Sequence, residues 1–363
     1  MLNKRKILIC AGGTGGHMLP AMRLGNILIK ENHDVIFSGM NLSSNTFFEK
    51  EKYVFVDIPS SPITLFHPFK MLSAWIKGMV KSFYLIKRFK PEIVVGFGSF
   101  HTFPLLLCVN MLNIPYVIFE ANVSFGRVNR LFLKKAKSIA SIFPNNMASH
   151  IVDMDLLTCN MKKKEKETSR KKLHLKKDLF TLLIFGGSQG AEFINEIVFQ
   201  IIKKYKKNWQ IIHVTGSEKQ KEKIKKLYDK KQIPSVVCVF EKNMPLLYSA
   251  ADLAVTRAGA ATMAELIFFS LPSVMIPYPF ASENHQVNNA LFFQNVVRGG
   301  KCLCQNEITV DLLLQTIENL SQYDHMEKLK RNIIQYKEKR ENSNDLPLHM
   351  LVYKSLKEKK YYG

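Results

Sequence analysis

The chain has 363 residues, 47% of them hydrophobic, and is therefore long enough for two domains of ordinary size, each with its own core. Its six cysteines form no Cys-x-x-Cys pair, and no histidine stands at metal-ligand spacing from them, which argues against a zinc site and a disulfide framework. The formal net charge of +22 favours a polyanionic partner, which could be nucleic acid, an anionic membrane surface or a phosphorylated substrate.

The N-terminus carries no export signal, because Lys4-Arg5-Lys6 precedes an apolar run that is too short for a signal peptide. The longest apolar stretch, Phe103 to Phe119, is interrupted by Asn110, Asn113 and Pro115. It is predicted as a buried helix followed by a strand and not as a membrane span. We therefore expect a protein of the reducing cytoplasm, for which any membrane attachment is peripheral.

The first predicted elements are a strand from Arg5 to Cys10, a glycine loop from Gly12 to His17 and a helix ending near Lys30. Such a corner binds anions, because first-turn N–H groups lack partners and the helix dipole is positive there. A dinucleotide site is an alternative, but Met18 stands where the nicotinamide fingerprint needs its third glycine. His17 either packs locally or, kept neutral by the helix N-terminus, acts as a general base toward a hydroxyl.

An amphipathic helix is predicted from Phe69 to Phe89. Its apolar residues recur at spacings of three and four: Phe69, Leu72, Trp75, Ile76, Met79, Phe83 and Ile86. Lys70, Lys77, Lys81 and Arg88 fall within about 20° of one line on the opposite side. One interpretation is a surface helix with its apolar face on the sheet. The other is a basic, aromatic-bearing face that rests on anionic headgroups.

Two further strands, Pro91 to Gly98 and Ile114 to Phe119, are each followed by polar residues. Asn122 follows the second, at the end of the strand where open α/β sheets bind ligands, and is predicted as a hydrogen-bonding residue or a turn residue. After a strand from Ser138 to Ile142, the stretch from Met161 to Lys177 carries nine basic residues against two acidic ones. It is predicted as a solvated linker or as a loop that approaches phosphates or headgroups.

The second half repeats the alternation of strands and helices, which predicts a parallel sheet with helices on both faces. Its strands are predicted at Leu182–Phe185, Gln210–Val214, Val236–Phe240, Leu253–Thr256 and Ser273–Ile276. Gly186 and Gly187 follow the first of these, as the glycine loop follows the first strand of the chain. This repetition predicts two α/β domains facing each other.

The stretch from Ala251 to Glu265 is predicted as a strand, a small-residue loop and the start of a helix. Thr262 and Glu265 either form a capping box, or Glu265 accepts two hydrogen bonds from a ribose diol while the amides of Gly259 to Ala261 face phosphate. Polar side chains from Glu283 to Ala290 occupy the next loop-to-helix corner, and we assign them to the recognition of sugar hydroxyls.

Four segments together resemble the signature motifs of the MurG family, bacterial transferases that add N-acetylglucosamine (GlcNAc) from UDP-GlcNAc to the lipid-linked muramyl-pentapeptide. These segments are Gly12–His17, Gly186–Ala191, Arg257–Glu265 and His285–Ala290. The resemblance spans most of the chain in the family's order. It implies a GT-B architecture, in which two Rossmann-like doubly wound domains face a cleft, and an inverting single displacement with no metal and no cofactor.

The resemblance also implies a division of the chain. Residues 1–158 would form the acceptor-binding and membrane-associating domain, and residues 159–340 the UDP-GlcNAc donor-binding domain. Residues 341–363 would form a C-terminal helix that crosses back to the first domain, and the amphipathic pattern from Leu346 to Lys360 fits such a helix.

Carried over position by position, the resemblance gives His17 the role of the base that deprotonates the muramyl 4-hydroxyl. Arg257 and helix N-termini would stabilise the leaving diphosphate, and Lys163 would stand for a donor-binding arginine without its bidentate fork. Phosphates would be bound by Thr14, Gly15 and Gly16, and the donor diphosphate by Ser188. The GlcNAc would be contacted by Asn122, and the sugar also by His285 and Gln286. The uracil would meet the backbone near Glu241, and the nucleotide would be bound by Ala260, Ala261, Thr262, Met263, Ala264 and Glu265, with Glu265 on the ribose.

The predicted helix from Phe69 to Phe89 stands where the family has its membrane-associating patch. That patch would comprise Phe69, Lys70, Trp75, Lys77, Met79, Lys81, Phe83 and Arg88. The resemblance thus implies a peripheral protein at the cytoplasmic face of the bacterial inner membrane. Its partners would be UDP-GlcNAc, undecaprenyl-pyrophosphoryl-MurNAc-pentapeptide and an anionic membrane surface, with room for other cell-wall synthesis proteins.

The chain departs from the family pattern in the acceptor half, where Gly96-Phe97-Gly98-Ser99-Phe100 replaces Gly-x-Gly-Gly-Tyr and Phe119 replaces a histidine. Two alternatives therefore stay open: a UDP-GlcNAc 2-epimerase, and a non-catalytic UDP-sugar or lipid-binding relic of the transferase. A nucleic-acid binder would fit the charge, but no RNP, helix-turn-helix or zinc-finger pattern accompanies it, so we expect no nucleic-acid partner.

Overall fold

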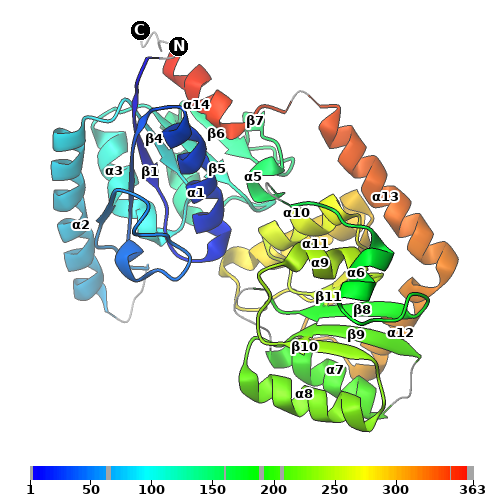
Figure 1. Cartoon of the computed structure of the whole chain (residues 1–363). Coiled ribbons are helices and arrows are strands. Elements are labelled where there is room, and N and C mark those ends of the chain that lie inside the picture. Colours follow the sequence, from blue (N-terminus) through cyan, green and yellow to red (C-terminus); the bar gives the residue numbers. More distant parts are fainter. Residues whose placement is uncertain are drawn as a thin grey trace. The chain divides into compact units, whose positions relative to one another are not determined.

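The protein is seen in a computed structural model that describes residues 3–62, 67–158, 161–187, 192–204, 208–343 and 345–357 (Figure 1). The chain forms two compact units. Residues 1–157 and 344–363 contribute to the first unit, and residues 158–343 form the second. Each unit is built on one sheet in which every paired strand is parallel, so the predicted α/β fold class is confirmed.

The first unit has a seven-stranded sheet in the order β3-β2-β1-β4-β5-β6-β7. Its strands are β1 (Lys6–Cys10), β2 (Asp34–Gly39), β3 (Phe55–Asp57), β4 (Ile93–Gly96), β5 (Tyr116–Glu120), β6 (Ser138–Ser141) and β7 (His150–Ile151). Its α-helices are α1 (Gly15–Lys30), α2 (Pro68–Phe89), α3 (Phe103–Met111), α4 (Arg127–Phe132), α5 (Asp155–Thr158) and α14 (Leu348–Lys357), and its 3₁₀ turns are η1 (Leu42–Ser44), η2 (Phe100–Thr102) and η3 (Leu133–Lys135).

The second unit has a six-stranded sheet in the order β10-β9-β8-β11-β12-β13. Its strands are β8 (Phe180–Phe185), β9 (Trp209–Val214), β10 (Ser235–Cys238), β11 (Leu253–Thr256), β12 (Ser273–Met275) and β13 (Gly300–Cys302). Its α-helices are α6 (Lys166–Lys172), α7 (Glu192–Lys204), α8 (Glu218–Lys230), α9 (Met244–Ala250), α10 (Ala260–Phe269), α11 (His285–Phe292), α12 (Val310–Ser321) and α13 (Tyr323–Glu341), with the short elements η4 (Ser282–Asn284) and η5 (Phe293–Val297).

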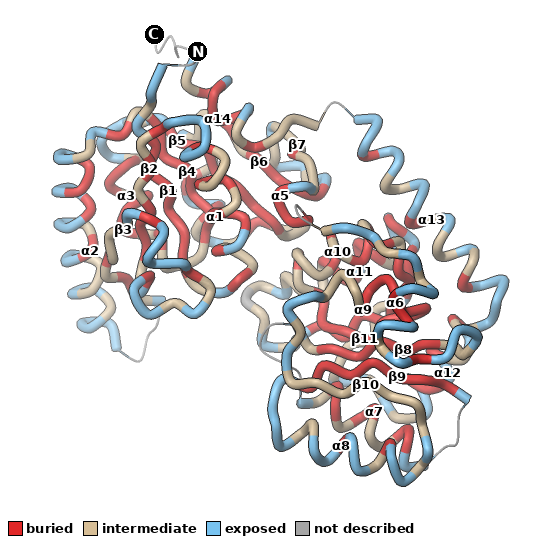
Figure 2. Tube along the Cα trace, viewed as in Figure 1, coloured by how far each residue is buried: buried red, intermediate tan, exposed pale blue. Residues whose placement is uncertain are grey.

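Both sheets share one winding plan. In each, the unit's first strand lies between its second and its fourth, which is the order of a doubly wound dinucleotide-type sheet. The central strands are covered on both faces, so β1 and β8 consist almost wholly of buried apolar residues (Figure 2). The loops that follow the central strands therefore lie at one edge of each sheet.

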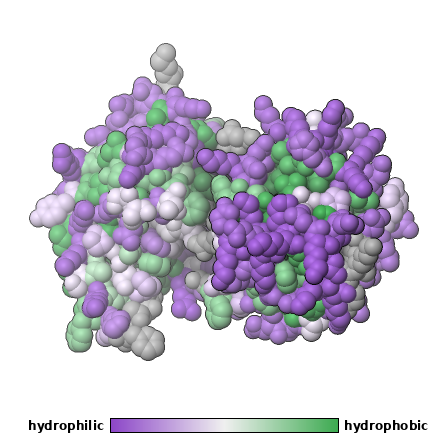
Figure 3. Space-filling model, turned by 60° about the horizontal axis from the view of Figure 1, so that its bottom comes forward, coloured by the Kyte–Doolittle hydropathy of each residue, from purple (hydrophilic) through white to green (hydrophobic). Residues whose placement is uncertain are grey.

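Helix α2 is the predicted amphipathic helix, but its apolar stripe is divided. Ile86 is buried and Met79 packs against the core, whereas Phe69, Leu72, Ile76 and Phe83 are exposed. The residues it buries are Gly78, Ser82, Leu85 and Ile86. A Cβ on Gly78 would lie 2.1 Å from the carbonyl oxygen of Pro59, so the helix needs glycine at this point of close approach. Most of the large apolar residues are exposed, with Phe69 86% and Ile76 53% exposed. Figure 3 shows hydrophobic and hydrophilic residues side by side on the surface of the first unit.

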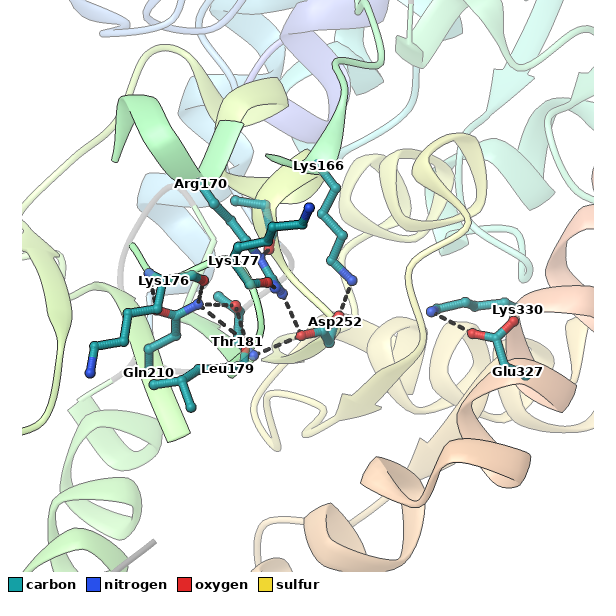
Figure 4. A network of polar contacts seen from close by, with 11 residues as sticks. Lys166, Arg170, Lys176, Lys177, Leu179, Thr181, Gln210, Asp252, Glu327 and Lys330 are labelled. Atoms are coloured by element: carbon teal, nitrogen blue, oxygen red, sulfur yellow. Dashed lines mark hydrogen bonds and ion pairs between the residues drawn. The ribbon is translucent and has the colours of Figure 1, made fainter. Parts of the chain in front are cut away.

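The basic stretch from Met161 to Lys177 is not the solvated linker predicted from its charge. Part of it forms α6, whose Arg170 is buried and donates to the carboxylate of buried Asp252 at 2.6 Å (Figure 4). Asp252 also accepts from the backbone N–H of Thr181 at 2.7 Å and pairs with Lys166. A buried carboxylate thus fastens this stretch to the second sheet, because burial of either charge alone is costly.

Helix α14 packs within the first unit. The Tyr353 hydroxyl hydrogen-bonds to Nε2 of His33 at 2.9 Å and to Glu31, and Ser355 Oγ lies 2.8 Å from Ser138 Oγ. Helix α14 therefore belongs to the first unit, together with the strands from the first half of the chain. Among the residues that the structure describes, no helix has both the length and the apolarity needed to cross a lipid bilayer.

Candidate functional site

The loop between β1 and α1 has the features that were predicted for an anion site. Thr14 is exposed and is the N-cap of α1, but its side chain makes no capping hydrogen bond, and no acidic residue stands in the first turn. Gly13 has a positive φ of 89°, which few other residues adopt at low cost. Gly15 and Gly16 open the helix, so their amides belong to the first turn, whose N–H groups have no helical partner.

His17, the third residue of α1, has a defined tautomer. Its Nδ1 lies 2.8 Å from the carbonyl oxygen of Phe97, just beyond β4. A carbonyl oxygen only accepts, so Nδ1 carries the proton of the neutral ring and Nε2 carries the lone pair. This is the tautomer that a general base needs, and it is fixed by the backbone of a neighbouring strand.

Asn122 is held at the end of β5 by a buried carboxylate. Oε1 of Glu120 accepts from the backbone N–H of Asn122 at 3.1 Å and from its side-chain amide at 2.9 Å. Oε2 accepts from the N–H of Gly126 and from Asn129 at 3.1 and 3.0 Å. Since β4 lies between β1 and β5, Asn122 and the glycine loop share one edge of the sheet. Sequence reasoning assigned no role to Glu120, which organises this loop.

The second anion corner joins β11 to α10. Gly259 is the N-cap, and the N–H of Met263 bonds to its carbonyl at 2.9 Å, so the amides of Ala260, Ala261 and Thr262 form the first turn. Thr262 is therefore the third residue of the helix and not its cap, and the capping-box interpretation of Thr262 and Glu265 is wrong. Met263 and Ala264 are fully buried and support the helix by packing.

Glu265 is oriented by a tyrosine that sequence reasoning missed. The hydroxyl of Tyr248, a buried residue of α9, donates to Oε2 of Glu265 at 2.6 Å. Burial, and then the carboxylate beside it, raise the pKa of Tyr248 well above 10, so the phenol stays a donor at every working pH.

Gln286 is also held by its surroundings. Its Oε1 accepts from the backbone N–H of Ala258 at 3.2 Å and of Tyr278 at 3.0 Å. Because the carbonyl end of the amide is engaged, its NH₂ end is the group that Gln286 can offer to a hydroxyl. The neighbouring His285 is half-buried and opens α11.

Arg257 holds the loop that follows β12 through hydrogen bonds to its backbone. Its Nη1 donates to the carbonyl oxygens of Ile276 and Pro277, both at 3.1 Å, and its guanidinium lies 5.4 Å from the centre of the Tyr278 ring. Burial lowers the pKa of Arg257 from its usual value. The side chain thus fixes the loop after β12, on which Gln286 depends, and its predicted role toward a leaving diphosphate stays a prediction.

Lys163, Glu241 and Ser188 were also predicted at the donor site. Lys163 is an exposed residue, and partial desolvation of its ammonium group, followed by the charges of Lys337 and Lys330, lowers its pKa. Within the described ranges, no hydrogen bond or ion pair connects Lys163 to α10. Oε1 of Glu241 accepts from the N–H of Asn243 at 2.6 Å ahead of α9. Ser188 lies outside the described residues.

Comparison with known proteins assigns both halves of the chain to one glycosyltransferase family. Residues 7–141 match the glycosyltransferase family 28 N-terminal domain, and residues 181–345 match the family's C-terminal domain. The chain is 35% identical to the UDP-N-acetylglucosamine--N-acetylmuramyl-(pentapeptide) pyrophosphoryl-undecaprenol N-acetylglucosamine transferase of Protochlamydia amoebophila, over 92% of each chain. It is 34% identical to the protein of that name from Rickettsia canadensis, over 87% of this chain and 90% of the other.

Solved structures agree on the fold. The crystal structure of Acinetobacter baumannii MurG superposes with a TM-score of 0.77 at 24% identity, covering 98% of this chain and all of the other. A UDP-glucose: anthocyanidin 3-O-glucosyltransferase in complex with UDP superposes with a TM-score of 0.67 at 15% identity. At these identities, the superpositions establish a shared two-domain glycosyltransferase fold.

Proposed function

The chain belongs to the MurG family of glycosyltransferases, and from this premise we propose that it moves GlcNAc from UDP-GlcNAc to the 4-hydroxyl of the lipid-linked muramyl-pentapeptide, which converts lipid I to lipid II. The observation that carries the proposal is His17, a histidine of fixed tautomer in the glycine corner of a chain related to these transferases over 92% of its length. The epimerase alternative is not favoured, since the relatives named above are transferases.

The reaction needs one base and a stabilised leaving group. Nε2 of His17 takes the proton of the muramyl hydroxyl while that oxygen attacks the anomeric carbon of GlcNAc and the bond from this carbon to the diphosphate oxygen breaks. The electron pair of the broken bond leaves with UDP, and the configuration inverts. The first-turn amides of α10 suit the negative charge that develops on the diphosphate.

Each unit has its own part in this proposal. The first unit binds the acceptor with the glycine loop and His17, and its Asn122 contacts the GlcNAc that is transferred. The second unit binds the donor, with Glu265 on the ribose diol and the NH₂ group of Gln286 on a sugar hydroxyl. Phosphates would bind at two helix N-termini, one formed by Thr14 to Gly16 and the other by Gly259 to Ala261.

The test is transfer of labelled GlcNAc from UDP-GlcNAc to a lipid-linked muramyl-pentapeptide analogue in the presence of EDTA. We expect transfer by the wild type, loss of transfer with retained UDP binding in His17→Ala, and a raised donor KM in Glu265→Ala. His325→Ala, which changes an exposed histidine of α13, serves as the control and keeps wild-type rates. A wild type that binds UDP-GlcNAc but transfers nothing would favour the non-catalytic relic.

We also propose that α2 docks the protein on the cytoplasmic face of an anionic inner membrane. The helix exposes an apolar strip of Phe69, Leu72, Ile76, Val80 and Phe83. Lys70, Lys77, Lys81 and Arg88 run along one flank of that strip, at about 120° from its centre, and not on its opposite side as predicted. Trp75 and Met79, also predicted in the membrane face, are half-buried and pack inward. A groove of about 410 Å³ lined by Pro59, Phe69, Lys70, Ser73, Ala74 and Lys77 offers apolar surface beside two ammonium groups. Apolar burial and attraction to anionic headgroups both favour such a surface.

Vesicle sedimentation tests the docking. We expect binding to vesicles that contain phosphatidylglycerol, weaker binding at high salt, and a loss of at least tenfold in affinity for Ile76→Asp, which puts a carboxylate into the apolar strip. Ile334→Asp is the matched control, since Ile334 is 40% exposed on α13 of the other unit. Equal losses in the two variants, or equal binding to uncharged vesicles, would count against docking through α2.

A further inference from the structure

A second histidine lies against the glycine loop of the first unit. His101 belongs to η2, directly after β4, and its side chain covers Gly12 and Gly13. A Cβ added to Gly12 would lie 2.5 Å from Cβ of His101, and one added to Gly13 would lie 3.1 Å from Cε1 of its ring. The loop therefore needs glycine at these positions partly because this imidazole occupies the adjoining space.

The ring of His101 is held in place by a strained serine. Oγ of Ser99 lies 2.7 Å from Nδ1 of His101, and the ring stacks on Phe100 with 3.9 Å between centroids. Ser99 has φ 71° and ψ 153°, a conformation that is nearly confined to glycine. Backbone strain of this kind persists only where the surrounding structure enforces it. Glycine would relieve the strain, but it lacks the hydroxyl that positions the imidazole of His101.

A serine hydroxyl can donate or accept, and we assign it here as the donor to Nδ1 of His101. Within the described residues, Nδ1 is the only acceptor for the Ser99 hydroxyl, so the hydroxyl donates and Nδ1 holds the lone pair. The proton of the neutral ring is then on Nε2, for which the described residues provide no partner. Burial, and then the charge of nearby His17, lower the pKa of His101 to about 4, so the ring stays neutral at working pH.

The two histidines of this corner are therefore opposite in tautomer. His17 donates through Nδ1 to a carbonyl and has its lone pair on Nε2, whereas His101 accepts at Nδ1 and has its N–H at Nε2. We propose that His101 is a substrate-binding residue whose Nε2–H donates to an anionic phosphate oxygen of the acceptor at the glycine loop. This inference rests on the proposed function, and it adds a residue to which the sequence motifs gave no role.

A purely structural histidine has a different environment in the same protein. His213 of β9 is buried, with Nδ1 2.8 Å from the Tyr228 hydroxyl and Nε2 3.0 Å from Oδ1 of Asn195. Both of its nitrogens are satisfied within the fold, whereas His101 has one nitrogen engaged. A second general base is also a poor assignment for His101, because its Nε2 already holds a proton.

Steady-state kinetics with the full-length protein tests the inference. We expect His101→Leu to raise the acceptor KM about tenfold, as the loss of one hydrogen bond to a charged group predicts, with the donor KM unchanged. His101→Gln, which keeps an N–H donor at a similar reach, should recover most of that loss. His213→Gln is the control and should lower the melting temperature without a selective change in acceptor KM.

Ser99→Gly separates a binding role from a structural one. Glycine relieves the backbone strain, so the melting temperature should not fall, yet the acceptor KM should rise several-fold because the ring loses its hydroxyl partner. An acceptor KM that is unchanged in both His101→Leu and Ser99→Gly would overturn the inference, and so would equal rises in donor and acceptor KM.

A spectroscopic measurement keeps the inference testable if the wild type transfers nothing, which would overturn the proposed function alone. ¹H–¹⁵N spectra of the histidine rings, assigned with His101→Gln, should show His101 protonated at Nε2 and not titrating above pH 5. Addition of a short-chain polyprenyl diphosphate should shift that Nε2–H signal. Protonation at Nδ1, or a signal that does not respond to the diphosphate, would contradict a binding role.

Discussion

Tyr248 is the residue whose removal tests the donor site most directly. Tyr248→Phe deletes the hydroxyl that donates to Glu265 at 2.6 Å and leaves the ring in its buried position. Without that bond, Glu265 is less well oriented toward a ribose diol, so we expect the donor KM to rise about fivefold to tenfold with a smaller change in kcat, in line with about 1 kcal/mol for one hydrogen bond. Initial rates at varied UDP-GlcNAc measure this.

Tyr228→Phe is the matched control for this change. Tyr228 is equally buried, and its hydroxyl bonds to Nδ1 of His213 in the core of the second unit. The control should lose stability and keep the wild-type donor KM. If both variants shifted the donor KM alike, the contact between Tyr248 and Glu265 would be structural only.

The residues that orient the candidate site could not be read from the motifs. The glycine corners, His17 and Glu265 are local patterns, and a single sequence suffices to pick them out. The contact that sets the tautomer of His17 comes from a backbone carbonyl 80 residues away, and the donor to Glu265 stands 17 residues before it. The parallel pairing of β1 with β4 brings His17 to Phe97, and the packing of α9 against α10 brings Tyr248 to Glu265.

At the scale of elements, the attachment of α6 to the second sheet depends on Asp252. Asp252→Asn removes the charge that partners buried Arg170 at 2.6 Å and accepts the N–H of Thr181. A buried guanidinium without its counter-ion is costly, so we expect the free energy of unfolding to fall by about 3 kcal/mol. Urea unfolding measures this loss.

Asp229→Asn provides the comparison for that loss. Asp229 pairs with Lys225 at 3.0 Å on the exposed surface of α8, where such a pair contributes about 0.5 kcal/mol. A loss in Asp252→Asn no larger than that in Asp229→Asn would mean that Arg170 is stabilised mainly by the carbonyl oxygens of Ala250 and Lys177, to which it also donates.

Elements with long apolar runs were predictable, and those defined by tertiary contact were not. β11 spans Leu253–Thr256 as predicted, and α2 differs from its predicted range by one residue at its start. β3, β7 and β13 have two or three residues each and lie at or near sheet edges, where pairing and not periodicity defines a strand. For α2, the interpretation that places the apolar face on the sheet is wrong for Phe69, Leu72, Ile76 and Phe83, which are exposed because the helix turns its Gly78 side inward.

At the scale of the whole molecule, the division of labour between the units gives the last prediction. Each unit has its own sheet and core, and the residues proposed to bind the uracil and ribose of UDP-GlcNAc belong to residues 158–343. A ligand that binds only the folded state stabilises it by about 2.7 kcal/mol at a hundred times its Kd. UDP should therefore slow amide exchange in the second unit, most of all in 256–265 and 276–286.

Hydrogen exchange followed by mass spectrometry, with and without UDP, measures this effect peptide by peptide. Peptides from β1, β4 and β5 report on the first unit and should exchange at unchanged rates, because their protection depends on a separate core. Glu265→Ala should reduce the protection at equal UDP concentration. Protection centred on Gly12 to His17 would instead place the nucleotide in the first unit, and the assignment of donor and acceptor halves would have to be reversed.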